Sequence, residues 1–223
     1  NEDCSTGVVE LDISVQLPLS YEDYSFSVAR LWNEVLLYSI RNDLARPTVH
    51  ARNLFHLSAA MYDAWAIVNE QGSPYLIGNN LNGFNSEFDT FSNTDSQHIN
   101  EINSISYAAY RLILHRFNNS PSYERISAKA NSLMTLLALD LNYLESDGYE
   151  ENSADLGNYI AEQYIDYGLI DGSNEQSDYI NQYYEPVNEP LAPIFSGNPT
   201  ISNPNRWQPL SLDIFVDQSG NVL

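Results

Sequence analysis

The sequence predicts an all-α protein: a helical bundle of about five helices, preceded by an extended N-terminal arm and followed by a proline-rich irregular segment. Apolar residues recur with helical spacing over most of residues 25–168. Prolines and turn-forming residues divide these stretches from one another. Six of the ten prolines fall in the last forty residues, where they exclude regular helix. We therefore divide the chain into an arm (1–24), a bundle (25–168) and a connector (169–223).

Residues 1–24 alternate apolar and polar positions, as an extended strand-like segment does. From Ser25 the period changes to that of an amphipathic helix, which we expect to run to about Leu44. A new helix is expected from Pro47, because a first-turn proline loses no hydrogen bond, to about Asn69. This second helix is apolar on most sides, so the sequence places it at the centre of the bundle.

Glycines, asparagines and serines make residues 71–94 a long loop. Helical spacing returns in three later stretches, at about 96–117, 121–141 and 153–167. The short connections favour antiparallel neighbours. In the connector, aromatic residues beside the prolines suggest a segment pinned along a surface, and a turn at Gly220-Asn221 closes two short strands.

The composition excludes several classes of function. With 9 Lys+Arg against 30 Asp+Glu, the net charge is −21, which argues against nucleic-acid binding. A hydrophobic fraction of 43% is too high for a disordered acidic tail. No stretch approaches the roughly 20 apolar residues of a transmembrane helix. The single cysteine, Cys4, has no partner for a disulfide within the chain; it is an exposed thiol or the remnant of a lipid anchor.

Two polar stripes are the candidate site. At about 100° per residue, one stripe lies on each of the first two helices. The stripes consist of Arg30, Glu34 and Arg41 on the first helix and Arg52, His56 and Asp63 on the second. If the helices pair antiparallel, Arg41 would approach Arg52, Glu34 would approach His56, and Arg30 would approach Asp63. A carboxylate-oriented histidine is a general-base arrangement, but an ion-pair network that fixes helix register is the favoured interpretation.

The sequence also lacks the usual motifs of metal sites, nucleophilic catalysis and phosphate binding. The sequence has no His-Glu-x-x-His, no Glu-x-x-His pair, no Gly-x-Ser-x-Gly and no phosphate-binding glycine loop with lysine. The acidic runs 144–151 and 166–172 match calcium loops only loosely. His50, His98 and His115 stand alone and are expected on helix surfaces or at caps. We assign no catalytic, cofactor-binding or metal-binding residue.

Two segments nevertheless resemble a known family. Arg30–Trp65, which contains Asn-Leu-Phe-His-Leu-Ser-Ala-Ala-Met-Tyr-Asp-Ala-Trp, is similar to the N-terminal helical hairpin of bacterial vanadium-dependent haloperoxidases of the type-2 phosphatidic-acid-phosphatase superfamily. Tyr183–Leu191, Pro199 and Asn203–Leu210 resemble the connector to the second half of those proteins. The resemblance covers about a quarter to a third of the chain. It implies a helical enzyme in which Lys, Arg, Ser, Gly and His hold vanadate for peroxide-dependent halide oxidation, or phosphate for ester hydrolysis.

The family's anion-binding motifs are missing from these 223 residues. Lys129 has no following Arg-Pro, Arg46-Pro47 has no preceding lysine, and Ser219-Gly220 is followed by Asn221 instead of His. We therefore interpret the chain as the N-terminal, non-catalytic half of such a protein. It would bind no vanadate alone, and its partner would be a C-terminal catalytic half or a second chain.

Two alternatives remain open: an acid phosphatase of the same superfamily, and a non-enzymatic surface or glycan-binding helical module. A start at Asn1 instead of Met suggests that a targeting segment has been removed, so we expect an exported protein.

Overall fold

The computed structural model describes residues 27–194 and 196–211, together with residues 214, 216, 217, 220 and 222. The expected arm at 1–24 lies outside the described residues. The helices are α1 (Val28–Arg41), α2 (Pro47–Asn69), α3 (Gln97–Arg116), α4 (Tyr123–Leu136) and α5 (Ser153–Ile170). The prediction of an all-α bundle of about five helices is confirmed.

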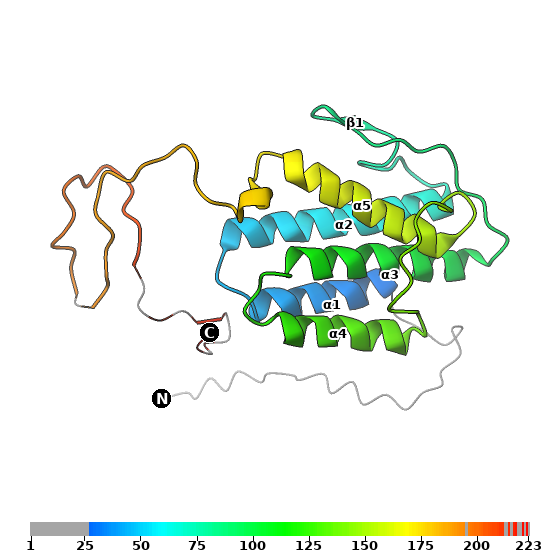
Figure 1. Cartoon of the computed structure of the whole chain (residues 1–223), viewed down its shortest axis with the longest axis horizontal. Helices are drawn as coiled ribbons and strands as arrows, with labels where there is room; N and C mark the ends of the chain where they lie inside the picture. Colours follow the sequence, from blue (N-terminus) through cyan, green and yellow to red (C-terminus); the bar gives the residue numbers. More distant parts are fainter. Residues whose placement is uncertain are drawn as a thin grey trace, which may run out of the picture.

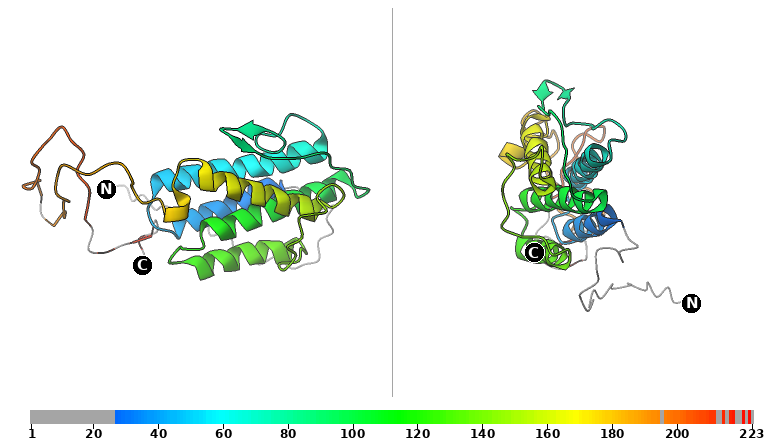
Figure 2. Two further views of the ribbon diagram at one scale, coloured as in Figure 1. Left: turned by 45° about the horizontal axis from the view of Figure 1, so that its top comes forward. Right: turned by 90° about the vertical axis from the view of Figure 1, so that its right-hand side faces the viewer.

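The helix α3 is the centre of the bundle. Seen along the bundle, it lies between the pair α2 and α5 on one side and the pair α1 and α4 on the other (Figure 2), and it contacts all four of them. Consecutive helices run antiparallel (Figure 1). The expectation that the second helix lies at the centre is therefore wrong: α2 is an outer helix, and one of its sides faces solvent.

The core forms where the helices meet α3. Trp32 of α1 is fully buried, and its indole Nε1 donates a hydrogen bond of 3.0 Å to the hydroxyl of Ser106 on α3. Leu112 and Ile113 of α3 are 1% exposed, and burying each such side chain contributes about 1.5–3 kcal/mol. The hydrogen bond between Trp32 and Ser106 lies in an otherwise apolar layer and therefore fixes how α1 is rotated against α3.

Two helix ends differ from the sequence prediction. The helix α4 ends at Leu136 and not near 141, because Ala138 has a left-handed φ of 56° and the amide of Leu139 bonds back to the carbonyl of Met134. The helix α5 continues through Gly168 to Ile170. Its start is as predicted, since the side chain of Asn152 accepts a hydrogen bond from the amide of Ala154.

The loop after α2 carries a small hairpin, β1 (Asn80–Leu81) and β2 (Phe84–Asn85), which pair antiparallel. Asn82 and Gly83 make its turn with φ angles of 52° and 89°, as a two-residue hairpin turn requires. The hairpin lies above α2 and α5 in Figure 1.

The connector projects from one end of the bundle after a short 3-10 helix, η2 (Glu175–Ser177) (Figure 1). The expectation that the connector is pinned along a surface is wrong around Tyr183, which is 95% exposed, whereas Asp178 and Asp217 contact Arg46 and Leu44 in the turn between α1 and α2. One buried side chain, Asn188, organises it: its amide nitrogen donates to three carbonyls, those of Asn203, Arg206 and Trp207. Its carbonyl oxygen accepts from the backbone and hydroxyl of Ser202 and from the amide of Asn203. The predicted final turn is consistent with the antiparallel bridge between Val216 and Val222 around Gly220.

Candidate functional site

Two arginines converge at the end of the bundle where α2 begins and α3 and α5 end. Arg52 comes from α2 and Arg116 from α3, and both guanidiniums lie against Gly168 of α5. A Cβ at Gly168 would come within 2.5 Å of an Arg116 nitrogen and 2.6 Å of an Arg52 nitrogen. A side chain at this position would displace the guanidiniums, so the glycine leaves them the space that they occupy.

Two carboxylates from the segment after α5 neutralise these arginines. The Nε of Arg52 donates to Asp171 at 2.5 Å and its Nη2 donates to Glu175 at 2.7 Å. Glu175 also forms an ion pair with Arg116, and its other oxygen lies 3.0 Å from Nε2 of His115. Both carboxylates have side chains that are only 10% exposed. We call residues 171–179 the latch segment and these contacts the arginine cluster.

His56 of α2 is held in the neutral form by the same cluster. Its Nδ1 lies 3.1 Å from an Nη of Arg116, which can only donate, so Nδ1 carries a lone pair and Nε2 carries the proton. The Nε2 atom lies 3.6 Å from Asp171. Burial, followed by the charges of Arg116 and Arg52, lowers the pKa of His56 to about 3. A histidine with this pKa and this contact is not a general base near neutral pH.

The other ionisable groups keep the charges of the arginine cluster balanced, with as many cations as anions. Burial lowers the pKa of Arg116 to about 10, so it remains protonated at neutral pH. Burial raises the pKa of Asp171, but hydrogen bonds from Arg52 and Ser173 outweigh it and bring that pKa below its ordinary value. Burial and the two guanidiniums lower the pKa of His115 to about 4. Two cations and two anions therefore face each other with neutral histidines beside them.

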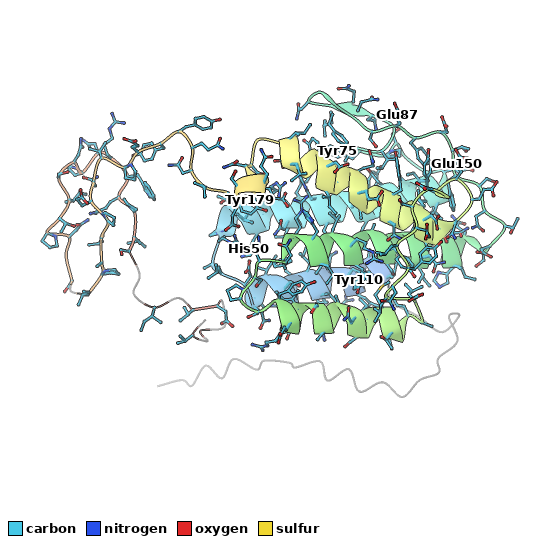
Figure 3. The ribbon with its side chains drawn as sticks, viewed as in Figure 1. His50, Tyr75, Glu87, Tyr110, Glu150 and Tyr179 are labelled. Carbon is cyan, nitrogen blue, oxygen red and sulfur yellow. The ribbon has the colours of Figure 1, made fainter. Side chains whose placement is uncertain are left out.

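The backbone of the latch segment is strained where it covers the arginines. Asn174, Asp178 and Tyr179 have left-handed φ angles of 62°, 51° and 61°, which is uncommon for residues other than glycine. The Tyr179 ring lies 5.8 Å from the Arg52 guanidinium and 5.7 Å from that of Arg46. Figure 3 labels Tyr179 at this end of the bundle. The ion pairs hold a backbone conformation that is unfavourable by itself.

The structure brings together only part of the predicted stripes. Arg52 and His56 meet in the arginine cluster, but the partners described above come from α3 and the latch segment and not from α1. Arg30, Glu34 and Arg41 are exposed, whereas His56 is 3% exposed. The expected pairing of Glu34 with His56 is replaced by contacts to Arg116 and Asp171.

Asp63 lies further along α2 and serves a different purpose. Its carboxylate is fully buried and accepts hydrogen bonds from the backbone amides of Tyr75, Leu76 and Ile77 and from the hydroxyl of Tyr164. Burial raises the pKa of Asp63, although these hydrogen bonds oppose the rise. The residue ties the loop after α2 to α5.

Sequence reasoning missed four members of the cluster: Arg116, Asp171, Glu175 and Tyr179. They lie 60 to 127 residues from their partners on α2, so no local pattern joins them. The run of polar residues after Gly168 was the available signal. His115 has no partner nearby in the sequence, but in the structure it contacts Glu175. His50 is buried at 4% exposure, with Nε2 2.7 Å from the carbonyl of Leu44.

A second feature is the exposed side of α2, which carries no charge. We call it the α2 face; it consists of Ala51, Leu54, Phe55, Ser58, Tyr62 and Trp65. These residues fall within about 100° of arc and span about 21 Å of helix. The four large side chains among them are 36% to 48% exposed.

The α2 face continues into a groove of about 400 Å³ between α1, α2 and α3, which we call the α2 groove. Apolar and aromatic side chains line most of it, including Leu31, Met61 and Ile105. His98 and Glu101 of α3 lie among its lining residues. Glu101 accepts a hydrogen bond of 2.7 Å from the side chain of Asn69.

Within the described part of the chain, no group of three or more His, Cys, Asp or Glu residues is arranged to hold a metal ion. No helix in that part is both long and apolar enough to cross a membrane. Comparison of the chain with protein-family models, with curated proteins and with solved structures gives no match.

Proposed function

We propose that this chain is the N-terminal helical part of a vanadium-dependent haloperoxidase-like enzyme. Its role is architectural: it supports and covers a catalytic half that oxidises halide with peroxide. The observation that carries the proposal is the arginine cluster, in which the two converging arginines are neutralised by the chain's own carboxylates.

Vanadate carries several charged oxygens and needs a set of cationic donors that are open to it. Arg52 and Arg116 do not fit this requirement, because Asp171 and Glu175 already occupy them. The donor set of the cluster therefore does not fit vanadate, and we derive no chemical step from it. The cofactor would be held by the catalytic half.

The segment that resembles the family supports this architectural role. Arg30–Trp65 forms most of α1, the turn after it and most of α2. Within it, Trp32 orients α1 on α3, Arg52 and His56 hold the latch segment, and Asp63 holds the loop after α2. Each of these polar residues joins elements of this bundle and leaves no reactive group facing solvent.

The test is to read the gene past the codon for Leu223 and to measure the intact mass of the natural protein. We expect a longer product that contains Pro-Ser-Gly-His and oxidises bromide when both vanadate and hydrogen peroxide are present. The control is the 223-residue chain alone, which should be inactive and should not retain vanadate. A longer product without the anion-binding motifs, or vanadate retained by this chain alone, would refute the proposal.

The same experiment separates the alternatives. A superfamily phosphatase would hydrolyse p-nitrophenyl phosphate without vanadate and would be inhibited by it. The exposed aromatic residues Tyr62 and Trp65 favour the glycan-binding alternative, since carbohydrate-binding surfaces use such rings. That alternative predicts oligosaccharide binding by this chain, detected by calorimetry, and its loss in Trp65→Ala.

A further inference from the structure

We infer that residues 9–26 of this chain dock on the chain's own α2 face and α2 groove. Residues 9–17, which we call the apolar row, lie extended along α2, and residues 18–26, which we call the junction, cover the groove. The occupant is a segment of the same polypeptide, so the inference goes beyond the proposed function and does not depend on it. The docking surface consists of described residues of α1, α2 and α3, and residues 9–26 precede the described part of the chain.

The α2 face is an apolar surface that the described residues leave uncovered. The other sides of α2 pack against α3 and α5, whereas Phe55 is 48% exposed and Tyr62 is 41% exposed. The chain carries a net charge of −21, yet the α2 face carries no formal charge. A contiguous apolar surface of this kind marks an interaction site.

The apolar row has the pattern that such a surface needs. Its alternate residues are aliphatic: Val9, Leu11, Ile13, Val15 and Leu17. In an extended segment alternate side chains point to the same side, so these five share one side and the polar residues between them share the other. Docking therefore buries the aliphatic side against the uncharged α2 face and leaves the carboxylates of Glu10 and Asp12 in water. No like charges are brought together, although the chain is strongly acidic.

The lengths of the apolar row and of the α2 face agree. An extended chain covers about 26 Å from Val9 to Leu17, at about 3.3 Å per residue. The α2 face spans about 21 Å from Ala51 to Trp65, at about 1.5 Å per residue. The junction reaches about 30 Å when it is extended. The apolar row is therefore long enough to cover the face, and the junction is long enough to bring it there.

The junction enters the described structure at the docking surface itself. Ser27, the first described residue, lines the α2 groove together with Tyr62 and Trp65. Phe26 directly precedes Ser27, and the junction carries two further aromatic residues, Tyr21 and Tyr24. The groove volume of about 400 Å³ is enough for aromatic side chains. This entry point also sets the direction of docking: the Leu17 end of the apolar row lies at Trp65, and the other end lies toward the start of α2.

The tether favours the chain's own segment over a second copy. A segment that a short tether holds beside its site has an effective concentration of roughly millimolar. A second copy would bring another charge of −21 and would be repelled. We therefore expect the α2 face to be covered at every protein concentration.

The experiment is hydroxyl-radical footprinting of the 223-residue chain, read by mass spectrometry at its three tryptophans. Trp32 is fully buried and Trp207 is 61% exposed, so they give the lower and upper limits of labelling in every sample. The bundle leaves Trp65 36% exposed, but we expect its labelling to lie close to that of Trp32 because the docked segment covers it. Labelling of Trp65 that lies midway between the two limits would overturn the inference.

Two variants of the apolar row add the same charge on opposite sides of it. Ile13→Asp places a carboxylate on the aliphatic side, and the labelling of Trp65 should rise severalfold because the row leaves the α2 face. Ser14→Asp is the matched control: it places the carboxylate on the polar side and should leave Trp65 protected. Both positions precede the helices, so the labelling of Trp32 should stay low in both variants. Equal labelling of Trp65 in the two variants would contradict docking by the aliphatic side.

A nitroxide label on the single cysteine, Cys4, tests the direction of docking. Cys4 lies five residues before Val9, so the label should broaden the amide resonance of Ala51 more than that of Trp65, and should leave that of Lys129 on α4 sharp. Broadening that is strongest at Trp65 or at Lys129 would overturn the inference. Protection of Trp65 that disappears on dilution would assign the α2 face to a second copy and would also overturn it.

Discussion

Acidification should destabilise this protein through His56, and the structure gives the size of the effect. In the folded state the pKa of His56 is about 3, against an ordinary value of 6.5, because burial and the arginines disfavour the imidazolium. Between these values the unfolded state binds a proton that the folded state does not bind. The free energy of unfolding therefore falls as the pH falls below about 6.5.

The slope is about 1.4 kcal/mol per pH unit for one proton. From about pH 6.5 to about pH 4.5, His56 should remove roughly 2 to 3 kcal/mol, which is a large part of the stability of an ordinary domain. The matched variant is His56→Gln, which keeps an acceptor for Arg116 and does not titrate. Protonation of His56 would also break the hydrogen bond from Arg116 to Nδ1, because a protonated ring has no lone pair to accept it.

The assay is urea unfolding followed by circular dichroism at several pH values, for the wild type and for His56→Gln. We expect the difference in free energy of unfolding between the two proteins to shift in favour of the variant as the pH falls. Every other ionisable residue is the same in both proteins, so this difference isolates His56. A difference that stays constant from about pH 7 to about pH 4.5 would refute the reasoning.

Three further predictions concern single contacts. Gly168→Ala should lower the free energy of unfolding by about 1–3 kcal/mol in urea titrations, despite the better helix propensity of alanine, because its Cβ would meet Arg52 and Arg116; a stabilised variant would contradict the packing. Asp63→Asn should cost about 1–3 kcal/mol and speed hydrogen exchange of the three amides that it binds, since an amide group cannot accept all four of its hydrogen bonds; unchanged exchange would argue against this contact. Trp32→Phe should lower the free energy of unfolding by about 2–4 kcal/mol at the melting midpoint, because a hydrogen bond to α3 and buried volume are lost. A loss below about 0.5 kcal/mol in thermal unfolding would be inconsistent with full burial.

The helices were predictable because their signals are local. Pro47 sets the start of α2 and Asn152 caps α5, and both operate within one turn of the helix. The end of α4 was not predictable from periodicity, because Leu139 continues the apolar pattern after the backbone has turned at Ala138. Helix propensity is a property of each residue type, whereas the end of α4 depends on the backbone conformation of one residue, Ala138.

The centre of the bundle was mispredicted for a physical reason. Apolarity on most sides of α2 indicates that water is excluded from them, but it does not say whether the same chain or another surface excludes it. The helix that does lie at the centre, α3, buries polar residues such as Asn100, Ser104 and Arg116, which lower its apparent apolarity. Ser104 donates a hydrogen bond to the carbonyl of Asn100 and Arg116 donates one to the carbonyl of Tyr164, so their burial is tolerated.

The candidate site was half predictable. Arg52 and His56 share a helix side, and that spacing identified them together. Their partners depend on how α3 and the latch segment fold back, and long-range ion pairs leave no periodic trace in the sequence.

The connector's dependence on Asn188 has a consequence for chemical ageing. Hydrolysis of that side-chain amide to a carboxylate would set a negative oxygen against three backbone carbonyls where a donor now stands. The loop would open while the helices stayed intact, because none of these carbonyls belongs to the bundle. Old preparations would then differ from fresh ones by one unit of charge and by faster proteolysis between residues 188 and 207.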